Sequence, residues 1–133
     1  MNKKKTSILY VDDEDINLRV FKLSFRREFD IHLTNSAKEA LEIIEREKID
    51  IIITDQRMPE MTGVELLEEI QKRYPNIPPA RLILSGYTEV ESINTAYEKY
   101  NLYKFISKPW NEKEIKRIFY KALEVENYEQ GKV

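Results

Sequence analysis

The sequence contains no cysteine, and only three glycines and one histidine among its 133 residues. Without cysteine the chain forms no disulfide and offers no thiolate ligand to a metal, a composition that suits the cytosol. The glycines Gly63, Gly86 and Gly131 are too far apart to form a P-loop or a dinucleotide-binding fingerprint. The single histidine, His32, falls in a predicted strand away from other candidate ligands, and we expect it to be structural.

The sequence also lacks an excess of charge and a long hydrophobic run. Lys+Arg 22 against Asp+Glu 24 leaves a net charge of -2, which gives no electrostatic reason to bind nucleic acid or an anionic membrane. Three lysines at positions 3–5 precede only the short apolar run Ile8–Val11, which is too short for a signal peptide or a membrane span. We therefore expect a cytoplasmic domain that contacts no nucleic acid directly and does not insert into a membrane.

Strand-like and helix-like segments alternate five times along the chain. Between the strands the apolar spacing changes to that of a helix, as in the run from Ala37 to Ile44. Four helix starts have a capping residue followed three positions later by glutamate, at Ser36, Thr62, Thr88 and Asn111. The predicted strands are Ile8–Val11, Ile31–Thr34, Ile49–Thr54, Arg81–Ser85 and Tyr103–Ile106.

Five βα units of this length predict an α/β fold, a single doubly wound (βα)5 domain of the flavodoxin-like type. The expected parallel five-stranded sheet has the order 2-1-3-4-5, with right-handed crossovers and helices on both faces. We place the domain at residues 1–126 and a C-terminal tail or truncated linker at residues 127–133. This order makes the first and third strands neighbours, and ligands bind at the carboxyl ends of such strands.

Three acidic side chains follow those two strands: Asp12 and Asp13 after the first, and Asp55 after the third. Two carboxylates about 5 Å apart repel by roughly 3 kcal/mol at an effective dielectric near 20. A fold keeps such a group when a cation offsets the repulsion or when a carboxylate has chemistry to do. A set made of acidic oxygens favours Mg²⁺.

Two more polar residues end the remaining core strands, Ser85 and Lys108. Three carboxylates, a hydroxyl and an ammonium at one sheet edge suit phosphoryl transfer onto a carboxylate, with Asp55 as the nucleophile. Mg²⁺, Ser85 and Lys108 could each contact one phosphoryl oxygen. Taken singly, each residue has a commoner explanation as a helix N-terminus, a turn or a surface charge, so the prediction depends on their joint pattern.

Four segments resemble the receiver domain of two-component response regulators of the chemotaxis-regulator type, and the resemblance covers about Ser7 to Leu123. They are Ile8–Glu14, Ile53–Gly63, Leu82–Tyr87 and Phe105–Trp110. By this resemblance the chain is a phosphorelay signal-transduction protein rather than an enzyme.

The resemblance implies a role for each matching residue near the acidic group. Asp55 is the phosphoacceptor that forms an aspartyl phosphate. Asp12 and Asp13 form the metal-binding acidic pair, and Asp55 and the backbone carbonyl of Arg57 complete the protein ligands of Mg²⁺.

The resemblance also implies a conformational switch. Ser85 and Lys108 contact the phosphoryl group, Phe105 is the switch aromatic, and the Lys108–Pro109 peptide bond is cis. Phosphorylation by a sensor histidine kinase or a phosphotransfer protein would change the face formed by helix 4, strand 5 and helix 5, through which the domain controls an output domain or a downstream protein. This expected face is rich in aromatic residues, for which partner binding, homodimerisation and partial burial are all left open: Tyr97, Tyr100, Tyr103, Trp110 and Tyr120.

Two large residues near the predicted phosphate, Arg57 and Tyr87, lead us to expect slow autodephosphorylation. One alternative function is an unphosphorylated pseudo-receiver that serves only as an interaction module. Another is a Mg²⁺-dependent aspartyl phosphohydrolase, which generally needs an acid two residues after the nucleophile, where this chain has Arg57. Receivers with similar sequences in these segments occur in larger regulators with phosphodiesterase or transcription-activating output domains. A stand-alone receiver is equally compatible with the sequence.

Overall fold

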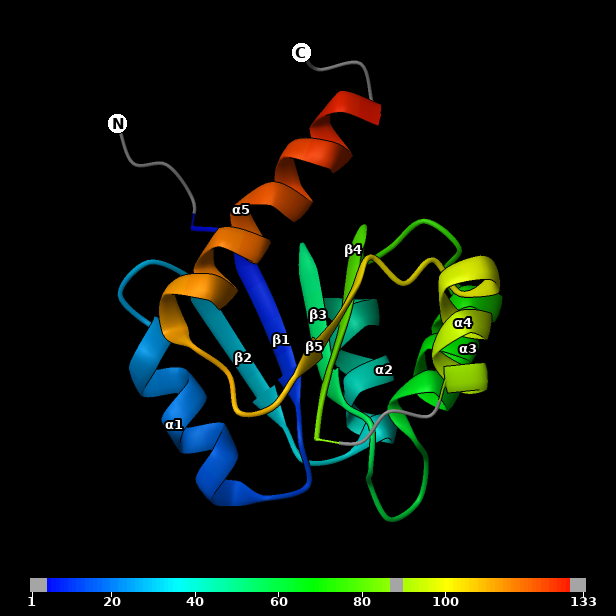
Figure 1. The fold of residues 1–133 in the computed structure, drawn as a ribbon, viewed down its shortest axis with the longest axis horizontal. Helices are drawn as coiled ribbons and strands as arrows, with labels where there is room; N and C mark the ends of the chain where they lie inside the picture. Colours follow the sequence, from blue (N-terminus) through cyan, green and yellow to red (C-terminus); the bar gives the residue numbers. More distant parts are fainter. Residues whose placement is uncertain (1–4, 87–89, 130–133) are drawn as a thin grey trace.

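The computed structural model describes residues 5–86 and 90–129 of the chain, with side chains described as far as Glu124. Strands and helices alternate throughout (Figure 1). The strands are β1 (Ser7–Val11), β2 (Asp30–Thr34), β3 (Ile51–Asp55), β4 (Ala80–Ser85) and β5 (Lys104–Ser107). The helices are α1 (Asp15–Phe25), α2 (Ala37–Arg46), α3 (Gly63–Arg73), α4 (Val90–Lys99) and α5 (Glu112–Glu129).

The five strands form one parallel sheet in the order β2-β1-β3-β4-β5, which confirms the predicted topology. The register pairs Val11 of β1 with Thr34 of β2 and with Thr54 of β3, so these three strands end side by side. Strand boundaries differ from the predicted ones by one or two residues. Asp55 is the last residue of β3, paired with Leu84, rather than the first residue after the strand.

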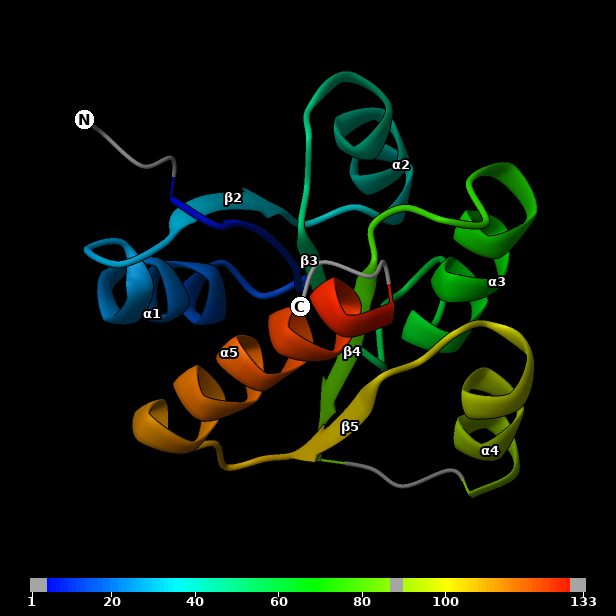
Figure 2. The same ribbon diagram turned by 90° about the horizontal axis from the view of Figure 1, so that it is seen from above.

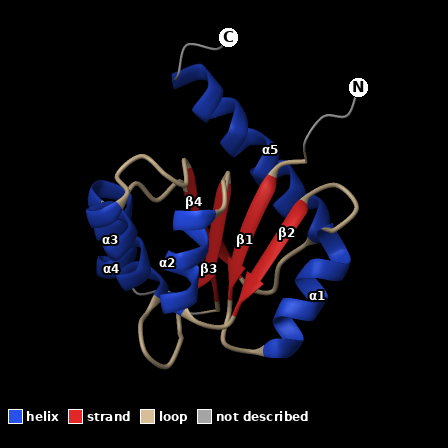
Figure 3. Cartoon of the chain, turned by 180° about the vertical axis from the view of Figure 1, so that it is seen from behind, coloured by secondary structure: helices blue, strands red, loops and turns tan. Residues whose placement is uncertain are grey.

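Helices cover both faces of the sheet, which explains why the central strands are apolar on both sides. Figure 2 shows α1 and α5 on one face and α2, α3 and α4 on the other. Alternate strand residues divide between the two layers: Ile8 and Tyr10 pack with α1 and α5, whereas Leu9 and Val11 pack with the other helices. The last turns of α5 project beyond the sheet, away from the carboxyl ends of the strands (Figures 1 and 3).

Three of the four predicted helix starts lie in the described residues, and in each the capping side chain accepts a backbone hydrogen bond. Thr62 and Glu65 form a complete capping box at α3. Ser36 accepts from the backbone of Glu39 at 3.0 Å, while the carboxylate of Glu39 instead accepts from Thr34. Asn111 Oδ1 accepts from the backbone of Glu114 at 3.1 Å. Thr88 lies outside the described residues.

Arg81 is a completely buried cation in β4 that the apolar strand pattern did not predict. Its guanidinium donates to Gln71 Oε1 at 2.6 Å and to Tyr74 O at 2.8 Å, at the carboxyl end of α3. It also donates to Tyr100 O, just after α4, and to three carbonyls of the α3–β4 loop. Burial lowers the pKa of Arg81 to about 10, which leaves it charged at neutral pH. Arg81 therefore joins the ends of two helices to the sheet.

Gly63, the first residue of α3, lies against the end of β3. A Cβ atom at this position would come within 2.5 Å of the backbone oxygen of Asp55 and 3.2 Å of Gln56 Cα. The backbone of Gly63 donates to Gln56 O at 2.9 Å, and the side chain of Gln56 accepts from Val64 N at 2.9 Å. Glycine thus permits the close approach that fixes the backbone of Asp55.

Replacement of Arg81 by methionine should lower the free energy of unfolding by about 3 kcal/mol, because several buried carbonyls lose their donors. Arg81→Lys keeps the charge but has fewer donors and no planar fork, so its loss should be intermediate. Urea denaturation followed by circular dichroism measures both variants. Unchanged stability of Arg81→Met would contradict the structural role.

Gly63→Ala should lower the free energy of unfolding by about 1–3 kcal/mol, since the added methyl group overlaps backbone atoms that cannot move freely. Gly86→Ala is the matched control, because a Cβ there meets nothing within 4 Å. Thermal denaturation of the two variants should separate them clearly. Equal stability of both alanine variants would show that α3 tolerates displacement from β3.

Candidate functional site

The carboxyl ends of the strands bring the three predicted acidic residues together. Asp12 follows β1, Asp13 comes next, and Asp55 ends β3. Each offers a carboxylate oxygen, and these three oxygens lie within 4.8 Å of one another. Asp12 is fully buried and Asp55 is 8% exposed, whereas Asp13 is open to solvent. The acidic group therefore consists of two buried carboxylates, those of Asp12 and Asp55, and one accessible carboxylate, that of Asp13.

Asp12 is held by donors on both of its oxygens. Its Oδ1 accepts from the backbone of Glu14 at 2.9 Å. Its Oδ2 accepts from the hydroxyl of Tyr10 at 2.5 Å and from Nδ2 of Asn17 at 3.1 Å. These contacts offset the cost of burying a carboxylate and fix its orientation.

Lys108 supplies the positive charge of the site. Its Nζ lies 3.3 Å from Asp55 Oδ1 and 3.8 Å from Asp12 Oδ2. Burial raises the pKa of the Asp55 carboxyl above its ordinary value, Lys108 opposes that shift, and the charge of Asp12 adds to it. One ammonium therefore faces a group of three carboxylates, and the site keeps an excess of negative charge.

This donor set fits Mg²⁺. Hard carboxylate oxygens are the ligands that Mg²⁺ prefers, and it binds through a few protein oxygens while keeping several waters. Asp12 and Asp55 are oriented by their surroundings, and the exposed Asp13 leaves a path for a hydrated ion. Asp12, Asp13 and Asp55 are the residues that could hold the cation.

Ser85 and Phe105 lie on β4 and β5, the two strands that follow β3 in the sheet. Ser85 is buried at the end of β4, and its backbone oxygen accepts from Lys108 N at 2.9 Å. The Lys108–Pro109 peptide bond is cis, as the resemblance implied. Phe105 in β5 is partly buried against the layer of α2, α3 and α4, and its backbone donates to Tyr97 Oη at 2.8 Å.

Two predicted neighbours of the phosphate have different outcomes. Arg57 follows Asp55 by two residues and is exposed. Tyr87 lies outside the described residues. The predicted effect of both residues on autodephosphorylation stays a prediction.

Tyr10 is a member of the site that the sequence pattern did not predict. Tyr10 and Asp12 are two residues apart in an extended segment, so their side chains point to the same face of the sheet. That spacing, together with a phenolic hydroxyl among the buried aliphatic residues of β1, was the signal that could have identified it.

The five aromatic residues predicted on one face do not form a single cluster. Trp110 packs against Phe25 of α1, with ring centroids 5.6 Å apart. Tyr120 donates to Glu28 at 2.7 Å, at the same α1–α5 contact. Tyr97 lies on α4 and is 42% exposed. The remaining two, Tyr100 and Tyr103, are partly buried in opposite layers. The rings therefore divide between the two sides of the sheet, with Tyr100, Tyr103 and Trp110 partly buried, and their role in partner binding or homodimerisation stays a prediction.

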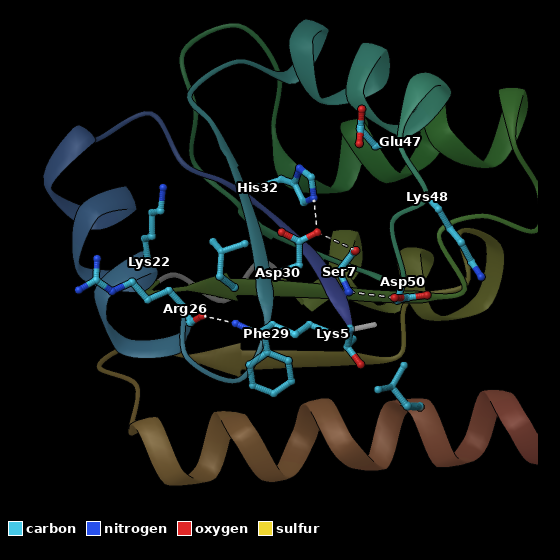
Figure 4. A pocket seen from close by; sticks show the side chains of 13 residues that line it. Lys5, Ser7, Lys22, Arg26, Phe29, Asp30, His32, Glu47, Lys48 and Asp50 are labelled. Carbon is cyan, nitrogen blue, oxygen red and sulfur yellow. Dashed lines mark hydrogen bonds and ion pairs between the residues drawn. The ribbon is translucent and has the colours of Figure 1, made fainter. Parts of the chain in front are cut away.

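A cavity of about 880 Å³ lies near the starts of β1 and β2, away from the acidic group (Figure 4). Polar groups on its floor pair with one another: Asp30 Oδ2 accepts from Ser7 Oγ and lies 3.2 Å from His32 Nε2. Asp50 accepts from the backbone of Ser7 at 2.9 Å. His32 thus contacts a neighbouring carboxylate and lies outside the candidate metal site.

Comparison with known proteins gives a consistent result. A family model described as the response regulator receiver domain matches residues 8–120. The hydrogenase transcriptional regulatory protein HoxA of Cupriavidus necator is 37% identical over 110 residues, covering 83% of this chain and 22% of HoxA. The transcriptional regulatory protein GlrR of Escherichia coli is 31% identical over 125 residues, covering 93% of this chain and 28% of GlrR. The chain thus spans about a quarter of the length of these relatives.

Solved structures agree. The receiver domain of a CheY-like protein from Methanospirillum hungatei superposes with a TM-score of 0.86 at 26% identity, over 95% of this chain and 99% of that one. The receiver domain of an HD domain-containing protein from Pseudomonas fluorescens gives the same TM-score at 25% identity, over 100% and 97% of the two chains. No helix among the described residues is long and apolar enough to cross a membrane. The chain belongs to the response regulator receiver domain family.

Proposed function

We propose that this domain is a phosphorylatable switch that accepts a phosphoryl group on Asp55 from a phosphohistidine donor. One observation carries the proposal: the Asp55 carboxylate lies 3.3 Å from the Lys108 ammonium and within one acidic group with Asp12 and Asp13. A nucleophile, a charge that can stabilise the phosphoryl oxygens and a set of cation ligands thus meet at one sheet edge. The intact acidic group also favours this function over a pseudo-receiver.

The transfer step is a displacement at phosphorus. A carboxylate oxygen of Asp55 attacks the phosphorus atom while the bond between phosphorus and the donor imidazole nitrogen breaks. The electron pair of that bond stays on the imidazole nitrogen, and the imidazole leaves as the neutral base because its other ring nitrogen is protonated in the donor. The product is an acyl phosphate on Asp55.

Each surrounding residue has a separate task. Mg²⁺ held by Asp12, Asp13, Asp55 and the backbone carbonyl of Arg57 would neutralise negative charge on the phosphoryl oxygens. Lys108 is placed to contact one of these oxygens, and the hydroxyl of Ser85 would contact another. Because the incoming group and the protein are both anionic, these positive and hydrogen-bonding partners decide whether the approach is favourable.

Phosphorylation would be transmitted by the contacts of Ser85 and Lys108. The new phosphoryl group adds charge and strong acceptor oxygens, so it draws both side chains toward Asp55. A shift at Ser85, at the end of β4, opens space for Phe105 on the adjacent strand β5. The face of α4, β5 and α5 then changes, which is a two-state equilibrium biased by a local charge.

The phosphodonor would dock beside α1. This helix begins two residues after Asp13 and carries three apolar side chains at i, i+4 and i+7 that are 62%, 45% and 64% exposed: Ile16, Val20 and Leu23. Such a stripe next to the acidic site suits an apolar helix of a sensor histidine kinase or a phosphotransfer protein.

The partner that receives the signal would contact the α4–β5–α5 face. The relatives HoxA and GlrR are named transcriptional regulatory proteins and are roughly three to four times as long as this chain. We therefore propose that the output is an attached or separate regulatory domain, in the cytoplasm where the phosphodonor is made. The exposed side chain of Arg57, two residues after Asp55, would slow hydrolysis of the acyl phosphate.

Incubation with acetyl phosphate and Mg²⁺ should add one phosphoryl group, seen as a single adduct by intact-mass spectrometry. Asp55→Asn removes the nucleophile with little change in size, and it should give no adduct. EDTA should abolish the adduct in the native protein. An adduct that persists in Asp55→Asn would contradict the assignment of the phosphoacceptor.

Mg²⁺ should stabilise the native protein and fail to stabilise Asp13→Asn. A ligand at 100 times its dissociation constant adds about 2.7 kcal/mol to the stability of the state that binds it. Asp13 is exposed, so its replacement should leave the fold intact. Asp15→Asn is the matched control, since Asp15 is also exposed but lies outside the acidic group. Thermal denaturation in Mg²⁺ and in EDTA measures the rise in melting temperature that Mg²⁺ produces in each variant. An equal rise in the two variants would contradict the proposed ligand set.

A further inference from the structure

Tyr10 combines an apolar location with a polar contact. Its side chain is 1% exposed and lies in the layer formed by the sheet, α1 and α5. Its hydroxyl reaches the end of β1 and donates to Asp12 Oδ2 at 2.5 Å. Tyr10 therefore joins the aromatic core to the acidic group through a hydrogen bond to Asp12.

The position of the Tyr10 ring is fixed by its neighbours. It stacks on Phe21 of α1 with centroids 4.3 Å apart and an interplanar angle of 25°. Phe21 in turn contacts Phe25, Trp110 and Phe119, which join α1 to α5. A ring held on this side has little freedom, so its hydroxyl stays at one point beside Asp12.

The hydroxyl contributes one of the few fixed donors to Asp12. Oδ2 also accepts from Asn17 Nδ2 at the longer distance of 3.1 Å, and Lys108 Nζ stands 3.8 Å away. Asn17 is partly exposed on α1 and Lys108 is shared with Asp55. Tyr10 makes the shortest of the three contacts and is the most deeply buried of the three residues.

We propose that Tyr10 is a positioning residue of the acidic group, whose hydroxyl holds the Asp12 carboxylate in the orientation that binds the divalent cation. This inference rests on the proposed function, because it assigns Tyr10 to the same Mg²⁺ site. Hydrogen-bond partners of metal-ligating carboxylates orient them, and their loss typically costs 10–100-fold in metal affinity.

Packing alone does not require a hydroxyl at this position. The other buried positions of β1 are occupied by Ile8, Leu9 and Val11, all aliphatic. A buried hydroxyl is unfavourable unless it is hydrogen-bonded, and here Asp12 is its partner.

The test is isothermal titration calorimetry of Mg²⁺ into the native protein, Tyr10→Phe and Tyr10→Leu. Tyr10→Phe keeps the stacked ring and removes only the hydroxyl, and we expect its Mg²⁺ dissociation constant to rise about 10-fold. Tyr10→Leu also removes the ring and should show at least the same rise, which keeps the test open if one variant folds poorly. Circular dichroism melts in EDTA report whether each variant is folded.

Two further measurements separate positioning from a general structural effect. Tyr97→Phe is the matched control, because it removes a phenol from α4 that bonds to the backbone of Phe105 rather than to the acidic group. Its Mg²⁺ affinity should equal that of the native protein. In phosphorylation by acetyl phosphate, Tyr10→Phe should need about 10-fold more Mg²⁺ for half-maximal rate but reach a rate near the native one at saturation.

The possible results separate the positioning role of Tyr10 from the proposed function on which it rests. Native protein that binds no Mg²⁺ and gains no phosphoryl group would overturn both. Native protein that binds Mg²⁺ with the same affinity as a folded Tyr10→Phe would overturn the role of Tyr10 alone. A selective loss of affinity in Tyr10→Phe, with Tyr97→Phe unchanged, would support it.

Discussion

The burial of two carboxylates at the same edge of the sheet is the constraint around which the rest of the site is arranged. Asp12 and Asp55 are almost inaccessible to water, and together with Asp13 they offer oxygens within 4.8 Å of one another. Such a group is unfavourable unless donors and cations surround it. Lys108 supplies one charge, and the donors around Asp12 supply hydrogen bonds. Under the proposed function, the remaining negative charge would attract a divalent cation to the site.

The scaffold holds this unfavourable arrangement by rigid contacts on both faces of the sheet. On one face the stack of Tyr10 on Phe21 connects Asp12 with α1 and α5. On the other, Gly63 lets α3 begin directly against the backbone of Asp55. Arg81 ties the carboxyl ends of α3 and α4 to β4. Packed elements therefore surround the acidic group on both faces of the sheet.

The elements, their order and the acidic group were predictable because each depends on a short local pattern. Apolar runs ending in aspartate predict buried strands and the edge where they meet, and this placed Asp12, Asp13 and Asp55 together correctly. Features that depend on contacts between distant segments were not predictable. Arg81 looked like the start of an ordinary strand, yet its partners come from α3, the α3–β4 loop and the end of α4. The five aromatic residues expected on one face divide between the two faces of the sheet. Tyr100 and Tyr103, only three residues apart, pack in opposite layers.

The most direct test of this account is the position of a bound divalent cation. Crystals of the protein grown with Mn²⁺ in place of Mg²⁺ would locate the ion by its anomalous scattering. The account predicts one site, with oxygens of Asp12, Asp13 and Asp55 around the ion and Lys108 still beside Asp55. An ion bound elsewhere, or the absence of an anomalous peak at a saturating Mn²⁺ concentration, would contradict the claim that this acidic group exists to hold a cation beside the nucleophile.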